Sequence, residues 1–220
     1  THAHRAVTGG TPGRKWLTAE INHALIVRLA SEFQGYCRDL HNETIGAFLA
    51  HGVARGQDID SVVRAMLKSG RKLDSGNAGW ANICNDFARF GVSVATDMRA
   101  RYPRKYSAWV KKIGALNDAR NAIAHDDRIK LSAYEAAQPL SLITFRNWRS
   151  ALTEVATGLD RVVGSYFEDL TGTAPWRGGP AWQVSATRRL GDLPEVARPR
   201  GCARLQPSRA AASSVVQWSR

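Results

Sequence analysis

The amino-acid sequence predicts an all-α protein, a helical bundle of about four to six helices. Apolar residues recur at steps of three and four along several segments, which is the spacing of one face of a helix. No segment shows an alternating pattern joined by a hairpin turn, which would indicate a pair of strands. With 220 residues, of which 44% are hydrophobic, the chain is long enough to bury one core, and we expect the bundle to span residues 15–172.

The two ends of the chain differ in composition from this bundle. Residues 1–14 have few apolar side chains and are rich in Gly, Thr and Pro, so we expect a disordered lead. Residues 173–220 lose the helical spacing and gain Pro, Gly and Arg, which predicts a disordered basic tail. Half of the formal net charge of +12 lies in residues 177–220. Such a charge favours polyanionic partners, whether a nucleic acid or an acidic protein.

Two helices are predicted in the first third of the chain. The first runs from Trp16 to near Gly52, as one helix or two collinear ones, with Thr18 as its N-cap. The second covers "DIDSVVRAMLKSG", residues 58–70, with an aspartate as its cap and Gly70 at its end. The next nine residues, "RKLDSGNAG", are predicted to form a loop.

Three further helices are predicted after this loop. One covers "NAGWANICNDFARFGV", capped by Asn77, and another begins near Tyr106 after a connection that Pro103 closes. The last has an apolar seam that steps by three and four through Phe145, Trp148, Leu152, Val155, Leu159, Val162 and Tyr166. Another helix must cover this seam, from the same chain or from a second copy.

Composition also narrows the class of protein. The three cysteines, Cys37, Cys84 and Cys202, are too few and too scattered for a disulfide framework or a zinc site, which suits a reducing cytoplasm. Cys37 and Cys84 lie in apolar helical segments, so we expect buried structural thiols. No run has the length of a membrane span and no signal peptide is visible. We therefore expect a cytoplasmic protein with no membrane partner, no metal ion and no cofactor.

The stretch "LNDARNAIAHDD", residues 116–127, holds the candidate functional residues. Arg120 falls on the apolar stripe of its helix, where a guanidinium without a partner is costly to bury. Asn121 and His125 are one turn apart, so the amide could orient the imidazole. Arg120 and His125 lie about 140° apart on an ideal helix. They converge on one ligand only if the helix distorts near its end or if a second protomer brings its own copy alongside.

These residues resemble the Arg-x(4–6)-His motif of the HEPN superfamily in its Arg-Asn-x-x-Ala-His form. The helical pattern from Trp16 to about Leu170 is also similar to a stand-alone HEPN domain, with the bacterial RiboL-PSP-type HEPN proteins as the nearest group. The resemblance implies a homodimer with metal-independent endoribonuclease activity, used in toxin–antitoxin or anti-phage systems. Arg120 and His125 would be its catalytic pair and Asn121 the polar residue after the arginine. Asp127 departs from the motif, because HEPN toxins silenced by nucleotidyltransferase partners often have tyrosine there.

The resemblance leads to a specific functional hypothesis. We expect attack of a ribose 2′-OH on the adjacent phosphate of RNA, giving a 2′,3′-cyclic phosphate and a 5′-OH, with His125 as base or acid and Arg120 at the phosphate. Lys68, Arg71 and Lys72 are candidates for binding the substrate, and an antitoxin or defence-system protein is a candidate partner. Two alternatives remain open: a non-catalytic HEPN-like module that binds RNA, a nucleotide or a protein, and a helical interaction domain whose basic tail contacts nucleic acid.

Overall fold

The computed structural model describes residues 16–51 and 57–176, and these residues are mostly helical with no strand among them. The predicted lead at residues 1–14 and residues 177–220 of the predicted tail lie outside the described residues. The helices are α2 (Trp16–His51), α3 (Gln57–Lys68), α4 (Lys72–Ser75), α5 (Trp80–Phe87), the 3₁₀ helix η1 (Ala88–Phe90), α6 (Val94–Arg101), α7 (Tyr106–Ala124), α8 (Arg128–Ala137) and α9 (Leu142–Thr171). The all-α prediction is confirmed. The described residues hold more helices than the expected four to six, because several of them are short.

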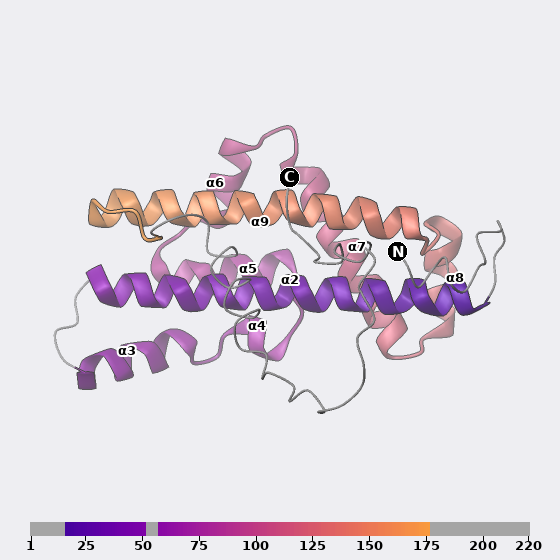
Figure 1. Cartoon of the computed structure of the whole chain (residues 1–220), viewed down its shortest axis with the longest axis horizontal. Coiled ribbons are helices and arrows are strands. Elements are labelled where there is room, and N and C mark those ends of the chain that lie inside the picture. The colour runs from indigo at the N-terminus through magenta and orange to yellow at the C-terminus, as the bar shows by residue number, and fades with distance from the viewer. Residues whose placement is uncertain (1–15, 52–56, 177–220) are drawn as a thin grey trace, which may run out of the picture.

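Two long helices, α2 and α9, run side by side in the same direction along the molecule (Figure 1). The Tyr36 hydroxyl donates to the carbonyl oxygen of Ala156 at 2.8 Å, and further along both helices the rings of Phe48 and Phe167 are 6.4 Å apart. The first helix is a single continuous one, and Thr18 lies inside it rather than capping it. The helices that cover the α9 seam, α2, α6 and α7, all belong to the same chain.

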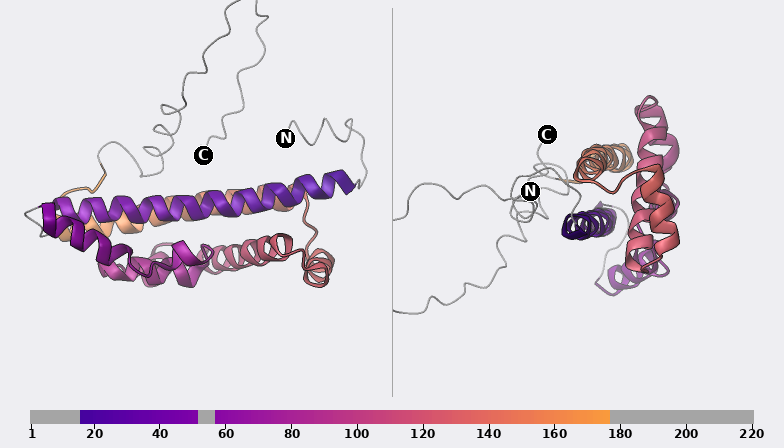
Figure 2. Two further views of the ribbon diagram at one scale, coloured as in Figure 1. Left: turned by 90° about the horizontal axis from the view of Figure 1, so that it is seen from below. Right: turned by 90° about the vertical axis from the view of Figure 1, so that its right-hand side faces the viewer.

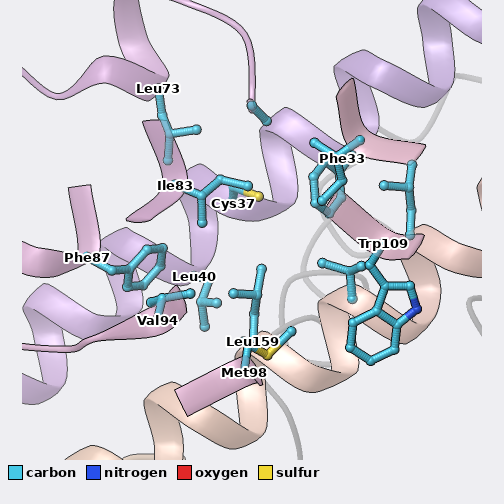
Figure 3. Packing of buried hydrophobic residues seen from close by; sticks show 14 of the residues in the cluster. Phe33, Cys37, Leu40, Leu73, Ile83, Phe87, Val94, Met98, Trp109 and Leu159 are labelled. Carbon is cyan, nitrogen blue, oxygen red and sulfur yellow. The ribbon is translucent and has the colours of Figure 1, made fainter. Parts of the chain in front are cut away.

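The shorter helices α4 to α8 form a second layer on one side of the α2–α9 pair (Figure 2). Within it, α7 packs on both long helices, and Trp109 Nε1 donates to Glu154 Oε2 of α9 at 3.0 Å. Side chains from both layers meet in one core, which includes Phe33 and Cys37 of α2 (Figure 3). This core fixes α7 against α2 and α9, and α7 carries the candidate functional residues.

Two predictions from local sequence were wrong, because hydrogen bonds between residues distant in the chain determine the structure there. The predicted loop at 71–79 contains the one-turn helix α4, whose first backbone N–H groups, at Lys72 and Leu73, both donate to the Asp86 carboxylate at 2.8 Å. Asn77 does not cap α5, because Gly79 occupies the N-cap and the Asn77 side chain points to α7 instead.

The end of the bundle and the cysteines refine two further predictions. Helix α9 ends at Gly172, in the left-handed conformation with φ 71°, close to the predicted boundary. The first residues of the predicted tail nevertheless fold back, since Trp176 packs against the core beside Gly164. Cys37 is fully buried as expected, and burial raises the pKa of its thiol. Cys84 is only half-buried, and burial raises its pKa to about 11.

Within the described residues, no helix combines the length and the apolar character that crossing a membrane requires.

Candidate functional site

The candidate site lies where α7 ends and the chain turns into α8. The N–H of Asp126 donates to the Ile123 carbonyl at 3.2 Å, and that of Asp127 to the Ala122 carbonyl at 3.0 Å. This pair of bonds is a Schellman motif, in which the residue after the C-cap adopts the left-handed conformation. Asp126 occupies that position with φ 47°, where glycine is usual. The abrupt end leaves His125 at the C-cap with an exposed side chain.

A chain of amides holds the arginine of the motif. Arg120 Nη1 donates to Asn121 Oδ1 at 3.1 Å, and the same oxygen accepts a hydrogen bond from Asn77 Nδ2 at 2.8 Å. Asn77 lies in the loop between α4 and α5, and its backbone carbonyl oxygen accepts a hydrogen bond from Asn82 Nδ2 at 2.9 Å. The loop therefore fixes the Asn121 amide, which in turn orients the guanidinium.

Two expectations about this motif need correction. Arg120 is half-buried at the margin of the buried face of α7, because Ala119 and Ala122 occupy the buried positions with 0% and 3% exposure. Asn121 does not orient His125, because its amide oxygen bonds to Arg120 and Asn77 instead. Within the described part of the chain, no side chain is hydrogen-bonded to the His125 imidazole.

Arg120 is half-buried and has no acidic partner in the part of the chain that the structure describes. Among the described residues no carboxylate lies within ion-pair distance of its guanidinium, although aspartates occur at positions 118, 126 and 127. The Asp126 carboxylate instead lies near Arg128, with 3.8 Å between Asp126 Oδ2 and Arg128 Nε. A half-buried guanidinium whose neighbours are neutral amides keeps its positive charge available for an anion.

Asp127, the residue that departs from the HEPN pattern, has a local structural role. Its carboxylate caps α8 by accepting from the Lys130 backbone N–H at 3.0 Å, and it also pairs with Lys130 Nζ at 2.9 Å. The backbone hydrogen bond from Lys130 is the main cause that lowers the pKa of Asp127. An aspartate at this position therefore starts α8 directly after the Schellman turn.

The three basic residues expected to bind substrate have different environments. Arg71 is buried, at 7% exposure, and its guanidinium pairs with both carboxylate oxygens of Asp74 at 2.7 and 2.9 Å and with Asn42 Oδ1 at 2.9 Å. These bonds attach α4 to α2, so a role for Arg71 in substrate contact is not supported. Lys68 and Lys72 are exposed, and Lys68 ends α3, far along the molecule from α8 (Figure 1).

Comparisons of the chain with protein-family models, with curated proteins and with solved structures found no match. Among the described residues, no three His, Cys, Asp or Glu side chains gather in a way that could hold a metal ion.

Two features of this region were missed by sequence reasoning. Asn77 is 44 residues from Asn121 in the chain, and no local pattern links the two. The second feature is a run from residue 98 to 117 that contains six basic side chains and no acidic one. A count of charge along the sequence would have found this run.

Proposed function

We propose that this protein is a metal-independent endoribonuclease of the HEPN type. The observation that carries the proposal is the uncompensated guanidinium of Arg120, held by Asn121 and Asn77 at the same helix end that exposes His125. An oriented cation and an imidazole together suit a phosphodiester, since the cation binds the phosphate and the imidazole transfers protons. The motif's resemblance to the HEPN Arg-x(4–6)-His pattern gives the reaction class.

In the proposed reaction the ribose 2′-OH attacks the adjacent phosphorus while an imidazole takes its proton. A bond forms between the 2′ oxygen and phosphorus, and the bond from phosphorus to the 5′ oxygen breaks. The leaving 5′ oxygen takes a proton, so the products are a 2′,3′-cyclic phosphate and a 5′-OH. Arg120 stabilises the negative charge that builds on the phosphate oxygens in the transition state.

The protein would act as a homodimer. One chain supplies a single motif histidine, whereas the reaction needs both a proton acceptor and a proton donor. A second copy placed with its α7 end alongside would supply the other imidazole and bring Arg120 and His125 of different chains to one phosphate. We further propose that the protein acts in the cytoplasm as a toxin or anti-phage effector, restrained by a partner protein.

The test is cleavage of a labelled RNA by the purified full chain in EDTA, with the products separated by gel. His125→Ala and Arg120→Ala should each slow cleavage about a hundredfold or more, because each removes a group that acts in the transition state. Asn77→Ala should have a smaller effect, since it removes only the anchor of the amide that orients Arg120. The matched control is Asn85→Ala, which truncates an exposed asparagine of α5 and should cleave like the parent.

If His125→Ala cleaves as fast as the parent, the assignment is wrong. Circular dichroism of each variant separates loss of chemistry from loss of fold. Products that end in a 2′,3′-cyclic phosphate are required, and a 3′-OH end would contradict the mechanism.

A second candidate is a non-catalytic module that binds RNA or a nucleotide through Arg120. The observation that favours it is that no described side chain holds the His125 ring, whereas catalytic imidazoles are usually oriented by a neighbour. This module would bind RNA without any strand scission, and Arg120→Ala but not His125→Ala would weaken the binding.

A further inference from the structure

The corner between α6 and α7 concentrates positive charge. We use the name basic corner for six side chains of residues 99–112, namely Arg99, Arg101, Arg104, Lys105, Lys111 and Lys112. All are exposed except Lys112, which is half-exposed. No acidic residue interrupts the chain between Asp97 and Asp118. The basic corner extends from the end of α6 into the first half of α7, whereas the candidate catalytic residues lie at the other end of α7.

Little of this charge is neutralised. Lys105 Nζ pairs with Glu154 of α9 at 3.1 Å, and the same carboxylate accepts a hydrogen bond from Trp109 Nε1. Burial alone would raise the pKa of Glu154, but the hydrogen bonds from Lys105 and Trp109 outweigh it and lower the pKa, so Glu154 stays charged. Among the described residues, the charged groups of Arg101, Arg104 and Lys111 have no carboxylate within ion-pair distance. These three cations are available to an anionic partner.

Aromatic rings lie among these cations in a fixed arrangement. The guanidinium of Arg99 sits over the Tyr106 ring, 5.0 Å from its centre. Trp80 Nε1 donates to the Tyr106 hydroxyl at 3.0 Å, and the two rings meet edge to face at 5.6 Å. The Tyr102 ring lies 5.1 Å from that of Trp109. Tyr102, Tyr106 and Trp80 are only half-buried.

From these observations we propose that the basic corner binds single-stranded RNA. Unpaired cations beside half-buried aromatic residues are a combination that suits single-stranded nucleic acids, because phosphates need positive charge and unstacked bases need aromatic surface. Arg101, Arg104 and Lys111 contact the phosphates, while Tyr102 and Tyr106 offer surface to bases. An acidic protein segment would be attracted by the cations alone and would gain nothing from the rings.

The basic corner complements the proposed catalytic end of the same helix. From Tyr106 to Arg120 the axis of α7 rises by about 21 Å, so one RNA strand could contact both ends. The choice of RNA rests on the proposed function, whereas the anionic strand itself follows from the charges and rings. The basic corner would hold the substrate and leave the chemistry to Arg120 and His125.

The test measures binding of a fluorescein-labelled single-stranded RNA of about 20 nucleotides by anisotropy. The full chain carries His125→Ala throughout, so that the RNA stays intact, and the buffer contains EDTA. Combining Arg101→Ala, Arg104→Ala and Lys111→Ala should weaken binding at least tenfold at low salt. It should also reduce the slope of log K against log salt by about two, as expected for three lost phosphate contacts.

The matched control removes three exposed arginines elsewhere, Arg28→Ala, Arg64→Ala and Arg146→Ala, and therefore changes the net charge equally. Both proteins keep residues 177–220, so the charge of that segment does not distinguish them. The control should bind nearly as tightly as the parent. A second variant, Arg104→Glu alone, replaces the triple variant if that protein fails to fold, and it should also weaken binding.

Three outcomes would overturn the proposal. The first is equal binding by the triple variant and the control. The second is that a polyglutamate peptide of the same charge competes for the protein as well as unlabelled RNA does. The third is equal affinity for DNA of the same sequence, which would overturn the choice of RNA. The binding assay and the cleavage assay test the two proposals separately. If the protein with His125→Ala as its only substitution still cleaves RNA while the triple variant loses binding, the proposed function is wrong and the basic corner stands.

Discussion

At the scale of single residues, Arg71 and Arg120 show how different the environments of two arginines in one protein can be. Arg71 is buried with a bidentate carboxylate and serves the fold. Arg120 is half-buried with neutral amides, and its charge is not compensated by any described carboxylate. The sequence identified Arg120, Asn121 and His125 because a local motif contains them. It could not identify Asn77, since only folding brings the α4–α5 loop to α7.

His41 carries a prediction about pH at the same scale. It is fully buried, and its ring lies 5.5 Å from that of Phe87 and 4.9 Å from that of Phe90. Burial, together with the nearby charge of Arg71, lowers the pKa of His41 from 6.5 to about 4, although Asp86 partly opposes the shift. The unfolded chain therefore binds a proton on His41 at a higher pH than the folded protein does.

The free energy of unfolding should consequently be highest above pH 6.5 and fall as the pH drops toward 4. The loss from His41 should reach about 3 kcal/mol. Urea unfolding at several pH values between 7 and 4 measures it. His41→Gln should flatten this part of the profile, whereas His23→Gln, at a histidine that lies 3.5 Å from Glu135, should leave it steep. An unchanged slope in His41→Gln would exclude His41 as the cause.

At the scale of elements, long helices and short ones obey different rules. The apolar seam of α9 and the pattern of α2 predicted their positions, because a long amphipathic helix repeats its signal over many turns. Helix α4 has one turn and repeats nothing. Both its ends are held from outside, by Asp86 at the N–H groups and by Gln34 and Arg38 at the Leu73 carbonyl. Such a helix exists only because of tertiary contacts.

Replacing Asp86 by alanine should therefore destabilise the protein by about 2–4 kcal/mol, because two backbone N–H groups lose a charged acceptor. Asp86→Asn should recover only part of this loss, since one carboxylate oxygen becomes an NH₂ group that cannot accept. The measurement is the urea midpoint of each variant. Asp169→Ala, at an exposed aspartate of α9, is the control and should change little. A loss below about 0.5 kcal/mol for Asp86→Ala would show that α4 does not depend on this carboxylate.

At the scale of the whole molecule, the α2–α9 pair sets the long axis and presents the α7–α8 turn near one end (Figure 1). Helix α8 and the first turn of α9 lie at that end and expose Ile129 and Ile143, with 84% and 69% of each residue accessible. In the proposed homodimer, a second copy that binds at this end would cover these two side chains. They would place two α7 ends near each other, as the proposed function requires.

Light scattering should give twice the mass of the chain at micromolar concentration. Ile129→Asp combined with Ile143→Asp should shift the protein toward monomer, because each adds a charge to the contact, and RNA cleavage should fall in parallel. Met66→Asp, at an equally exposed apolar side chain of α3, is the control and should leave the mass unchanged. A parent protein that is monomeric yet cleaves RNA would contradict catalysis by a shared site.

The sequence by itself determined that this protein is an all-α bundle, where its long helices lie and which residues form the motif at the end of α7. Those features depend on helical periodicity and on side chains close together in the chain. Only the tertiary structure decided that α2, α6 and α7 cover the α9 seam, that Asp127 caps α8 and that Asn77 anchors Asn121. It also decided that Arg71 is internal while Arg120 keeps an uncompensated charge. Burial and hydrogen-bond partners come from residues distant in sequence, and no local pattern contains them.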